Sequence, residues 1–115
     1  MSEKKVEYCA IYQREKEIRA DGHISCPMLT EAQGCVNQCA AGISSYYCEK
    51  YSLPAQHEFQ EGFYVIEGTG QVKIGQDEFP VEKGYSFLVP VYMEHGMKKS
   101  AKCDVLKVFW FHSSI

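Results

Sequence analysis

Three residues have side chains that can together bind a divalent metal ion. His57 and Glu61 stand four positions apart, directly before the apolar run Phe63 to Ile66. If the chain between them is extended, its alternating side chains point His57 and Glu61 to the same side. His95 begins a later run, which can lie beside this one in a closed meander. Two neutral imidazoles and one carboxylate suit a borderline divalent ion and leave coordination positions open for water or substrate.

The pair His57 and Glu61 is by itself a weak signal. A histidine or glutamate near a turn is more often a surface residue than a metal ligand. The same alternation places Phe63 and Val65 on the side of Glu61, which predicts a dry wall next to the polar pair. From these residues alone, a surface pair and a metal site both remain open.

The elements that must position these residues are short strands. The second half of the chain alternates apolar runs with turns such as Gly68-Thr69-Gly70 and Lys83-Gly84. Regular punctuation of this kind favours an all-β sandwich or barrel over a βαβ fold. The predicted strands cover residues 63–67, 71–75, 78–81, 85–90, 94–99 and 104–111.

The first half of the chain gives weaker signals. The run Ile43 to Leu53 reads as β-rich and ends at Pro54, which stops a hydrogen-bonded ladder. The stretch Ile24 to Leu29 carries Pro27, which favours an edge strand or a loop. The stretch Val6 to Tyr12 fits either a strand or a short helix.

The last predicted strand is apolar on both faces, with Lys107 as the exception. A strand in a one-sided sheet would leave one face in water. We therefore expect a second sheet or a partner subunit to cover the other face, and a homodimer is the predicted assembly. The two faces consist of Leu106, Val108 and Trp110, and of Val105, Phe109 and Phe111.

Composition and charge exclude several classes. The 115 residues suit a single domain, with N-terminal strands and loops over 1–42 and a barrel core over 43–112. A net charge of −3 without long runs of like charge gives no footprint for nucleic acid or an anionic membrane. No export signal or membrane span is recognisable, so we expect a cytoplasmic protein.

Six cysteines without an export signal are expected to be reduced thiols. Cys35 and Cys39 have three residues between them, and Cys26 lies nearby. This spacing lacks the tight pairs of most structural zinc sites. A zinc-binding or redox-active thiol site around these three cysteines is therefore a lesser alternative.

Two segments resemble the motifs of the cupin family. Pro54 to Gly70 is similar to the first motif, in which a His-x-His pair is followed by a glutamate, an aromatic-rich strand and a Gly-x-Gly turn. The segment Gly84-x5-Pro90-x4-His95 is similar to the second. The gap between the motifs is short, as in small single-domain cupins. The resemblance covers about half the chain and implies a double-stranded β-helix, or jelly-roll barrel, around one divalent metal.

The resemblance also implies which residues bind the metal. His57 matches the second histidine of the first motif, Glu61 its glutamate, and His95 the histidine of the second motif. Ala55 stands where the first histidine is expected, with Gln56 as a possible additional ligand if the register shifts by one. The remaining trio resembles a 2-His-1-carboxylate site, which suits Fe(II), Mn(II), Zn(II) or Ni(II).

Further residues are candidates for the wall of the pocket, although side chains of their types are common fillers of barrel interiors. The predicted lining comprises Tyr46, Cys48, Phe63, Val65, Tyr92 and Met97, with His112 as a further candidate.

The resemblance favours a metal-dependent enzyme that acts on a small polar substrate chelated to the metal, with isomerase, lyase and dioxygenase chemistry all compatible. The alternative is a non-catalytic small-ligand-binding or sensor cupin whose metal site is partly lost at Ala55. Both interpretations predict a small-molecule ligand and neither predicts a nucleic acid or a membrane as partner.

Overall fold

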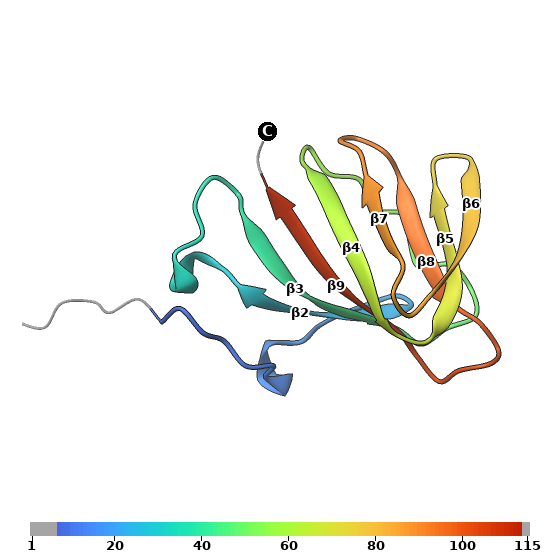
Figure 1. Cartoon of the computed structure of the whole chain (residues 1–115), viewed down its shortest axis with the longest axis horizontal. Coiled ribbons are helices and arrows are strands. Elements are labelled where there is room, and N and C mark those ends of the chain that lie inside the picture. The colour runs from blue at the N-terminus through green and yellow to red at the C-terminus, as the bar shows by residue number, and fades with distance from the viewer. Residues whose placement is uncertain (1–6, 114–115) are drawn as a thin grey trace, which may run out of the picture.

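The chain folds into two antiparallel sheets, described by a computed structural model over residues 7–113 (Figure 1). The six-stranded sheet has the order β1-β2-β3-β9-β4-β7 and the three-stranded sheet the order β6-β5-β8. The only helical elements among the described residues are two short 3-10 helices, η1 and η2. The bounds are η1 Arg14–Lys16, β1 Ile18–Ala20, β2 His23–Leu29, η2 Glu31–Gln33, β3 Ala40–Tyr46, β4 Gln60–Glu67, β5 Thr69–Ile74, β6 Asp77–Glu82, β7 Ser86–Val89, β8 His95–Lys99 and β9 Leu106–Ser113.

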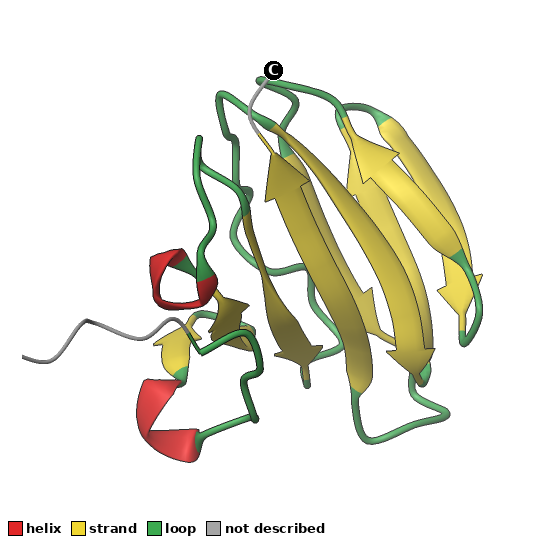
Figure 2. Cartoon of the chain, turned by 60° about the vertical axis from the view of Figure 1, so that its left-hand side comes forward, coloured by secondary structure: helices red, strands yellow, loops and turns green. Residues whose placement is uncertain are grey.

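The predicted jelly-roll barrel is confirmed. The two sheets face each other with strands of both inclined in similar directions (Figure 2). One hydrophobic core joins them, because inward residues of β4 and β9 pack with residues of β5 and β8. The six strands predicted in the second half all form, with their ends shifted by a few residues. The fully buried large side chains of the core include Phe63, Val65, Val72, Met97, Leu106 and Val108.

Strand β9 lies at the centre of the larger sheet, between β3 and β4. Its inward residues Leu106, Val108 and Trp110 are buried, as the alternation predicted. On the outward face Phe109 is partly buried, whereas Phe111 is 49% exposed. The second sheet therefore covers only one face of β9, and a partner subunit on the other face stays a prediction.

The segment between β3 and β4 differs from the prediction. A strand was expected over Ile43 to Leu53, but β3 begins at Ala40 and ends at Tyr46. Beyond Tyr46 the chain crosses to the smaller sheet and follows β8, where Lys99 N–H donates to the Cys48 carbonyl at 3.0 Å. This stretch thus forms backbone hydrogen bonds with β8 and does not continue β3 as a strand.

The N-terminal part builds more of the barrel than its sequence indicated. Strand β2 pairs with β3 along most of its length, whereas β1 pairs only with residues 23–25. Pro27 therefore lies on an edge portion of β2, next to an irregularity in the ladder, where its missing N–H costs least. Residues 7–12 form neither the strand nor the helix expected there, and Val6 lies outside the described residues. Strand β3 runs across the predicted boundary at residues 42–43.

Candidate metal centre

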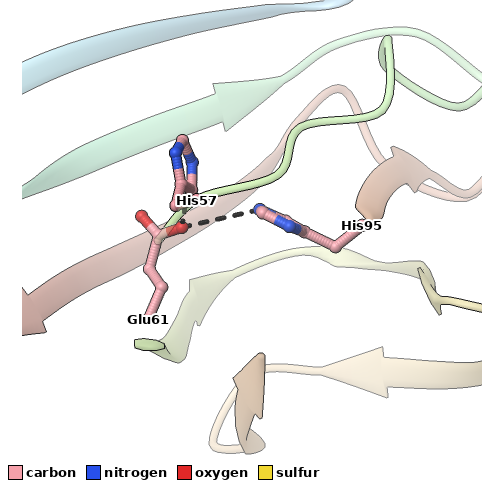
Figure 3. Close-up of side chains that lie close together, drawn as sticks. All are labelled: His57, Glu61 and His95. Carbon is pink, nitrogen blue, oxygen red and sulfur yellow. Dashed lines mark ion pairs between the residues drawn. The ribbon is translucent and has the colours of Figure 1, made fainter. Parts of the chain in front are cut away.

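His57, Glu61 and His95 converge at one point inside the barrel (Figure 3). Glu61 Oε1 lies 3.7 Å from His57 Nε2 and 3.5 Å from His95 Nε2. One donor atom from each residue lies within 4.8 Å of the others. Donors that share a tetrahedral ion at about 2.0–2.2 Å lie roughly 3.4 Å apart, so small side-chain rotations would bring this trio into coordination distance.

Strand β8 fixes the direction of His95. The residue opens the strand, and its ring Nδ1 lies 3.4 Å from the Met93 carbonyl oxygen. A proton on Nδ1 would donate to this carbonyl and leave the Nε2 lone pair free to bind an ion beside Glu61. A histidine that donates its other ring nitrogen to a backbone carbonyl is the usual arrangement of a metal ligand.

His57 reaches the same point from a loop. Strand β4 begins only at Gln60, so the extended chain predicted from His57 to Glu61 is incomplete. The His57 ring stacks on Phe59 with centroids 4.7 Å apart, and its backbone carbonyl accepts a hydrogen bond from Tyr92 N–H. These contacts hold the imidazole beside Glu61 without a strand.

The electrostatics of the trio call for a cation. Glu61 is only 8% exposed, and His57 and His95 are its ion-pair partners in the described chain. Burial lowers the pKa of His57, with Glu61 opposing and His95 and His112 adding to the shift. A neutral His57 does not compensate the buried carboxylate, and an uncompensated buried charge is costly. The residues therefore fit a divalent ion.

Ala55 occupies the position that the resemblance assigns to the first histidine. It exchanges two backbone hydrogen bonds of 3.0 Å with His95 and its side chain borders the site. The Gln56 amide instead donates to the Tyr92 carbonyl at 2.6 Å on the exposed surface, and Gln56 does not border the cavity. The structure therefore does not support Gln56 as an additional ligand.

The trio opens into a cavity of about 270 Å³. Of the predicted lining residues, Tyr46, Phe63 and the further candidate His112 border it. Val65 and Met97 do not border the cavity. They lie in the hydrophobic core between the two sheets, where they pack with other apolar side chains. Neither Cys48 nor Tyr92 borders the cavity. Cys48 follows the end of β3. Tyr92 lies in a turn with a φ of 62°, and its side chain is exposed.

Residues of the N-terminal half also border the cavity, and no motif in the sequence indicated them. His23 and Ser25 on β2 and Ser44 on β3 all border the cavity, although residues 1–42 carry no motif. They reach the cavity because β2 pairs with β3 and β3 pairs with β9. Alternation along Ile43 to Leu53 could have indicated Ser44, since it shares a face with Tyr46. The remaining lining residues are Ser52, Leu53, Ala55, Phe59, Gly96 and Trp110, beside the trio itself.

His112 lies directly across from Glu61 on the neighbouring strand β9. Its Nδ1 lies 2.9 Å from the Gln38 carbonyl oxygen, which assigns the proton to Nδ1 and leaves Nε2 as an acceptor. The ring stacks on Phe59 at 3.9 Å, and Phe59 stacks on His57. Aromatic contacts thus link His112 to His57 through Phe59.

The cysteines form no comparable site in the described part of the chain. Cys26 is buried, and Cys35 and Cys39 border a separate surface hollow with Tyr8 and Leu29. Within residues 7–113, only His57, Glu61 and His95 bring three metal-binding side chains together. No helix among these residues is long and apolar enough to cross a membrane.

Similar folds occur among solved structures. The Cnp3 cupin domain of Schizosaccharomyces pombe has a TM-score of 0.72 at 14% identity, with 83% of this chain and 66% of that chain covered. The plu4264 protein of Photorhabdus luminescens has a TM-score of 0.74 at 19% identity, with 89% and 83% covered. A complex of Fe(II) HppE with its substrate has a TM-score of 0.73 at 14% identity, with 90% and 56% covered. This chain thus spans just under two thirds of Cnp3 and little more than half of HppE.

Sequence comparison gives the family directly. A comparison with curated protein sequences finds no match. A family model described as a cupin domain matches residues 49–112, more than half of the chain, and this range contains His57, Glu61 and His95. The chain belongs to the cupin family.

Proposed function

We propose that this cupin binds one divalent metal ion through His57, Glu61 and His95 and acts as an enzyme on a small polar substrate that chelates the ion. The observation that carries the proposal is the convergence of three donor atoms within 4.8 Å around a buried carboxylate. The ligand set suits Fe(II), Mn(II), Zn(II) or Ni(II). HppE, which shares the fold, has been described with Fe(II) and a substrate.

The bound ion would polarise a chelated carbonyl or hydroxyl oxygen of the substrate. The protein orients the two imidazoles, through Met93 for His95 and through Phe59 for His57. Ala55 presents only a methyl group, so one coordination position more than in a four-ligand site is open to substrate. The cavity supplies the space for this bidentate ligand.

Tyr46 is the candidate proton donor of the cavity. Burial raises the pKa of its phenol, and the nearby Glu61 carboxylate raises it further. The phenol therefore stays protonated near neutral pH and can donate to a substrate oxygen. Isomerase, lyase and dioxygenase reactions on a chelated substrate all remain compatible with this arrangement.

Metal analysis of the full chain, purified without chelator, tests the proposal. We expect about one ion per chain in the wild type and a loss of at least about tenfold in affinity in His57→Ala and His95→Ala. Gln56→Ala is the matched control, because Gln56 is next to His57 but outside the cavity. Equal metal content and thermal stability in all four proteins would overturn the proposal.

A second candidate function is a non-catalytic ligand-binding or sensor cupin. The observation that favours it is Ala55, whose methyl group lies where the resemblance places a histidine. In this case the cavity still binds a small molecule, but the purified wild type holds metal only in substoichiometric amounts.

We also propose a homodimer formed through the outer face of the larger sheet. Outward residues of neighbouring strands gather apolar side chains there: Tyr64 on β4 and Phe109 on β9 are direct partners, and Leu88 and Phe111 both pair with Gly62. Tyr64, Leu88 and Phe111 are each about half exposed. A contiguous apolar face of this kind is typical of a surface that associates with another protein.

A further inference from the structure

Strands β2 and β3 add a polar wall to the cavity that the metal-binding motifs do not predict. Ser25 and Ser44 lie directly opposite each other on the paired strands, and both border the cavity. Tyr46 stands two residues beyond Ser44 on the same face of β3. This wall therefore presents three hydroxyl groups.

Trp110 completes the wall with an unpaired donor. The indole is 8% exposed, borders the cavity and packs flat over Gly42 of β3, where an added Cβ would lie 2.5 Å from Cζ2. Its Nε1–H is shielded from solvent and has no hydrogen-bond partner among the described residues. A buried donor without an acceptor destabilises the folded chain. A ligand oxygen that came within hydrogen-bond distance of this group would supply the missing acceptor.

The wall is polar and lacks the long basic side chains that bind anionic groups. No lysine or arginine is among the residues that border the cavity, and Glu61 is its carboxylate. Hydroxyl groups and an indole N–H form hydrogen bonds with neutral oxygens, whereas a second anionic group of a ligand would enter without a compensating cation. The chemistry of the wall thus matches uncharged hydroxyl groups.

We propose that the cavity takes a ligand with a chelating end on the metal site and an uncharged, hydroxylated remainder against Ser25, Ser44 and Trp110. The inference deepens the proposed function and rests on it for the chelating end. A cavity of about 270 Å³ has room for about nine water molecules, at roughly 30 Å³ each. The ligand is therefore a compact polyhydroxylated acid or carbonyl compound.

Three probes with the same four-carbon chain and the same α-hydroxycarboxylate end test this inference: 2-hydroxybutanoate, erythronate and erythronate 4-phosphate. Calorimetry of the Ni(II)-loaded full chain is expected to give erythronate a dissociation constant at least about tenfold lower than that of 2-hydroxybutanoate. Erythronate 4-phosphate is expected to bind more weakly than erythronate, because the wall offers its phosphate no cation.

Two variants test whether Trp110 and Ser44 cause the preference for erythronate over 2-hydroxybutanoate. Trp110→Phe keeps an aromatic ring but removes the N–H, and Ser44→Ala removes one hydroxyl. We expect both to bring erythronate and 2-hydroxybutanoate toward equal affinity while metal content and 2-hydroxybutanoate binding stay at wild-type values. Ser45→Ala is the matched control, since Ser45 is the neighbour of Ser44 and does not border the cavity.

Equal binding of the first two probes to the wild type, or a preference that persists in both variants, would refute the inference while leaving the metal site intact. Tightest binding of the phosphate would refute it as well. If the wild type takes up no metal, the proposed function fails separately. The erythronate preference and its loss in Ser44→Ala are then measured on the metal-free chain, where their presence supports the polar wall and their absence refutes it.

Discussion

Ala55 and His95 exchange two backbone hydrogen bonds of 3.0 Å, so the loop before β4 is fastened directly to the first residue of β8. This bridge brings the two sequence motifs together at the metal site. It also places the Ala55 methyl group on the border of the cavity, next to the His95 imidazole. A longer side chain at this position would extend toward His57, Glu61 and His95.

Ala55→His is expected to raise metal affinity by about tenfold or more, because a third imidazole would complete a four-ligand site. Competition with a chromogenic chelator for Ni(II) or Zn(II) measures the change. The bridge to His95 uses only backbone atoms, so the substitution leaves it in place.

Gln56→His serves as the control for this gain of function. The Gln56 side chain lies on the exposed surface against the Tyr92 carbonyl, so a histidine there is expected to leave metal affinity unchanged. An equal gain from both substitutions would show that the position of Ala55 is not special.

Glu61→Gln is expected to change the stability of the chain differently with and without metal. In the metal-free chain the change removes a buried charge, so we expect unchanged or increased thermal stability. With metal at 100 times its dissociation constant, a binding chain gains about 2.7 kcal/mol, a gain that the variant should lose. Thermal unfolding with and without Ni(II) measures both, and a similar metal-induced gain in Glu61→Gln would contradict the assignment of this ligand.

His23 is expected to make stability depend on pH. Burial lowers its pKa below the ordinary value of 6.5, His95 lowers it further, and the Asp21 backbone opposes the shift. Between the folded and unfolded pKa values the unfolded chain binds more protons, so this contribution to stability is complete above about pH 6.5 and is lost as the pH falls through the folded value.

Urea unfolding of the wild type and of His23→Gln over pH 5 to about pH 8 checks this contribution. The variant should lose less stability on acidification than the wild type. Some slope will remain, because the pKa of His57 is lowered in the same direction. An unchanged slope would show that His23 is protonated as readily in the folded chain as in the unfolded one.

Gly42→Ala is expected to displace the Trp110 ring. An added Cβ would meet Cζ2 at 2.5 Å and also the Cys26 carbonyl oxygen, so the β2–β3 ladder cannot accommodate it without movement. Overpacking of this kind costs about 1–3 kcal/mol. Urea unfolding gives the loss and the fluorescence of Trp110, the single tryptophan, reports the displacement. Ser45→Ala on the same strand should change neither.

Phe111→Asp is expected to break the proposed homodimer. The residue is 49% exposed on the outer face of β9, where a carboxylate would be desolvated by a partner subunit. Sedimentation equilibrium should show a dimer for the wild type and a monomer for the variant. Leu53→Asp, at an exposed residue outside this face, is the control and should stay dimeric.

The sequence by itself determined the strands of the second half and the three metal-binding candidates. Alternation and turn residues are local signals, so Phe63, Val65 and the inward face of β9 could be placed without a fold. The spacing of His57 and Glu61, with His95 at the start of a later strand, gave the trio. The resemblance to the cupin motifs supplied the barrel that joins them.

Only the tertiary structure decided what surrounds the trio. His23, Ser25 and Ser44 reach the cavity because β2 pairs with β3 and β3 pairs with β9. These contacts join residues far apart in sequence, and no local pattern encodes them. Long-range packing also explains why Met97 lies in the core and not at the cavity, and why the Gln56 side chain bonds the Tyr92 carbonyl. The types and spacing of residues thus determined the candidate metal ligands, whereas strand pairing determined which other residues border the cavity.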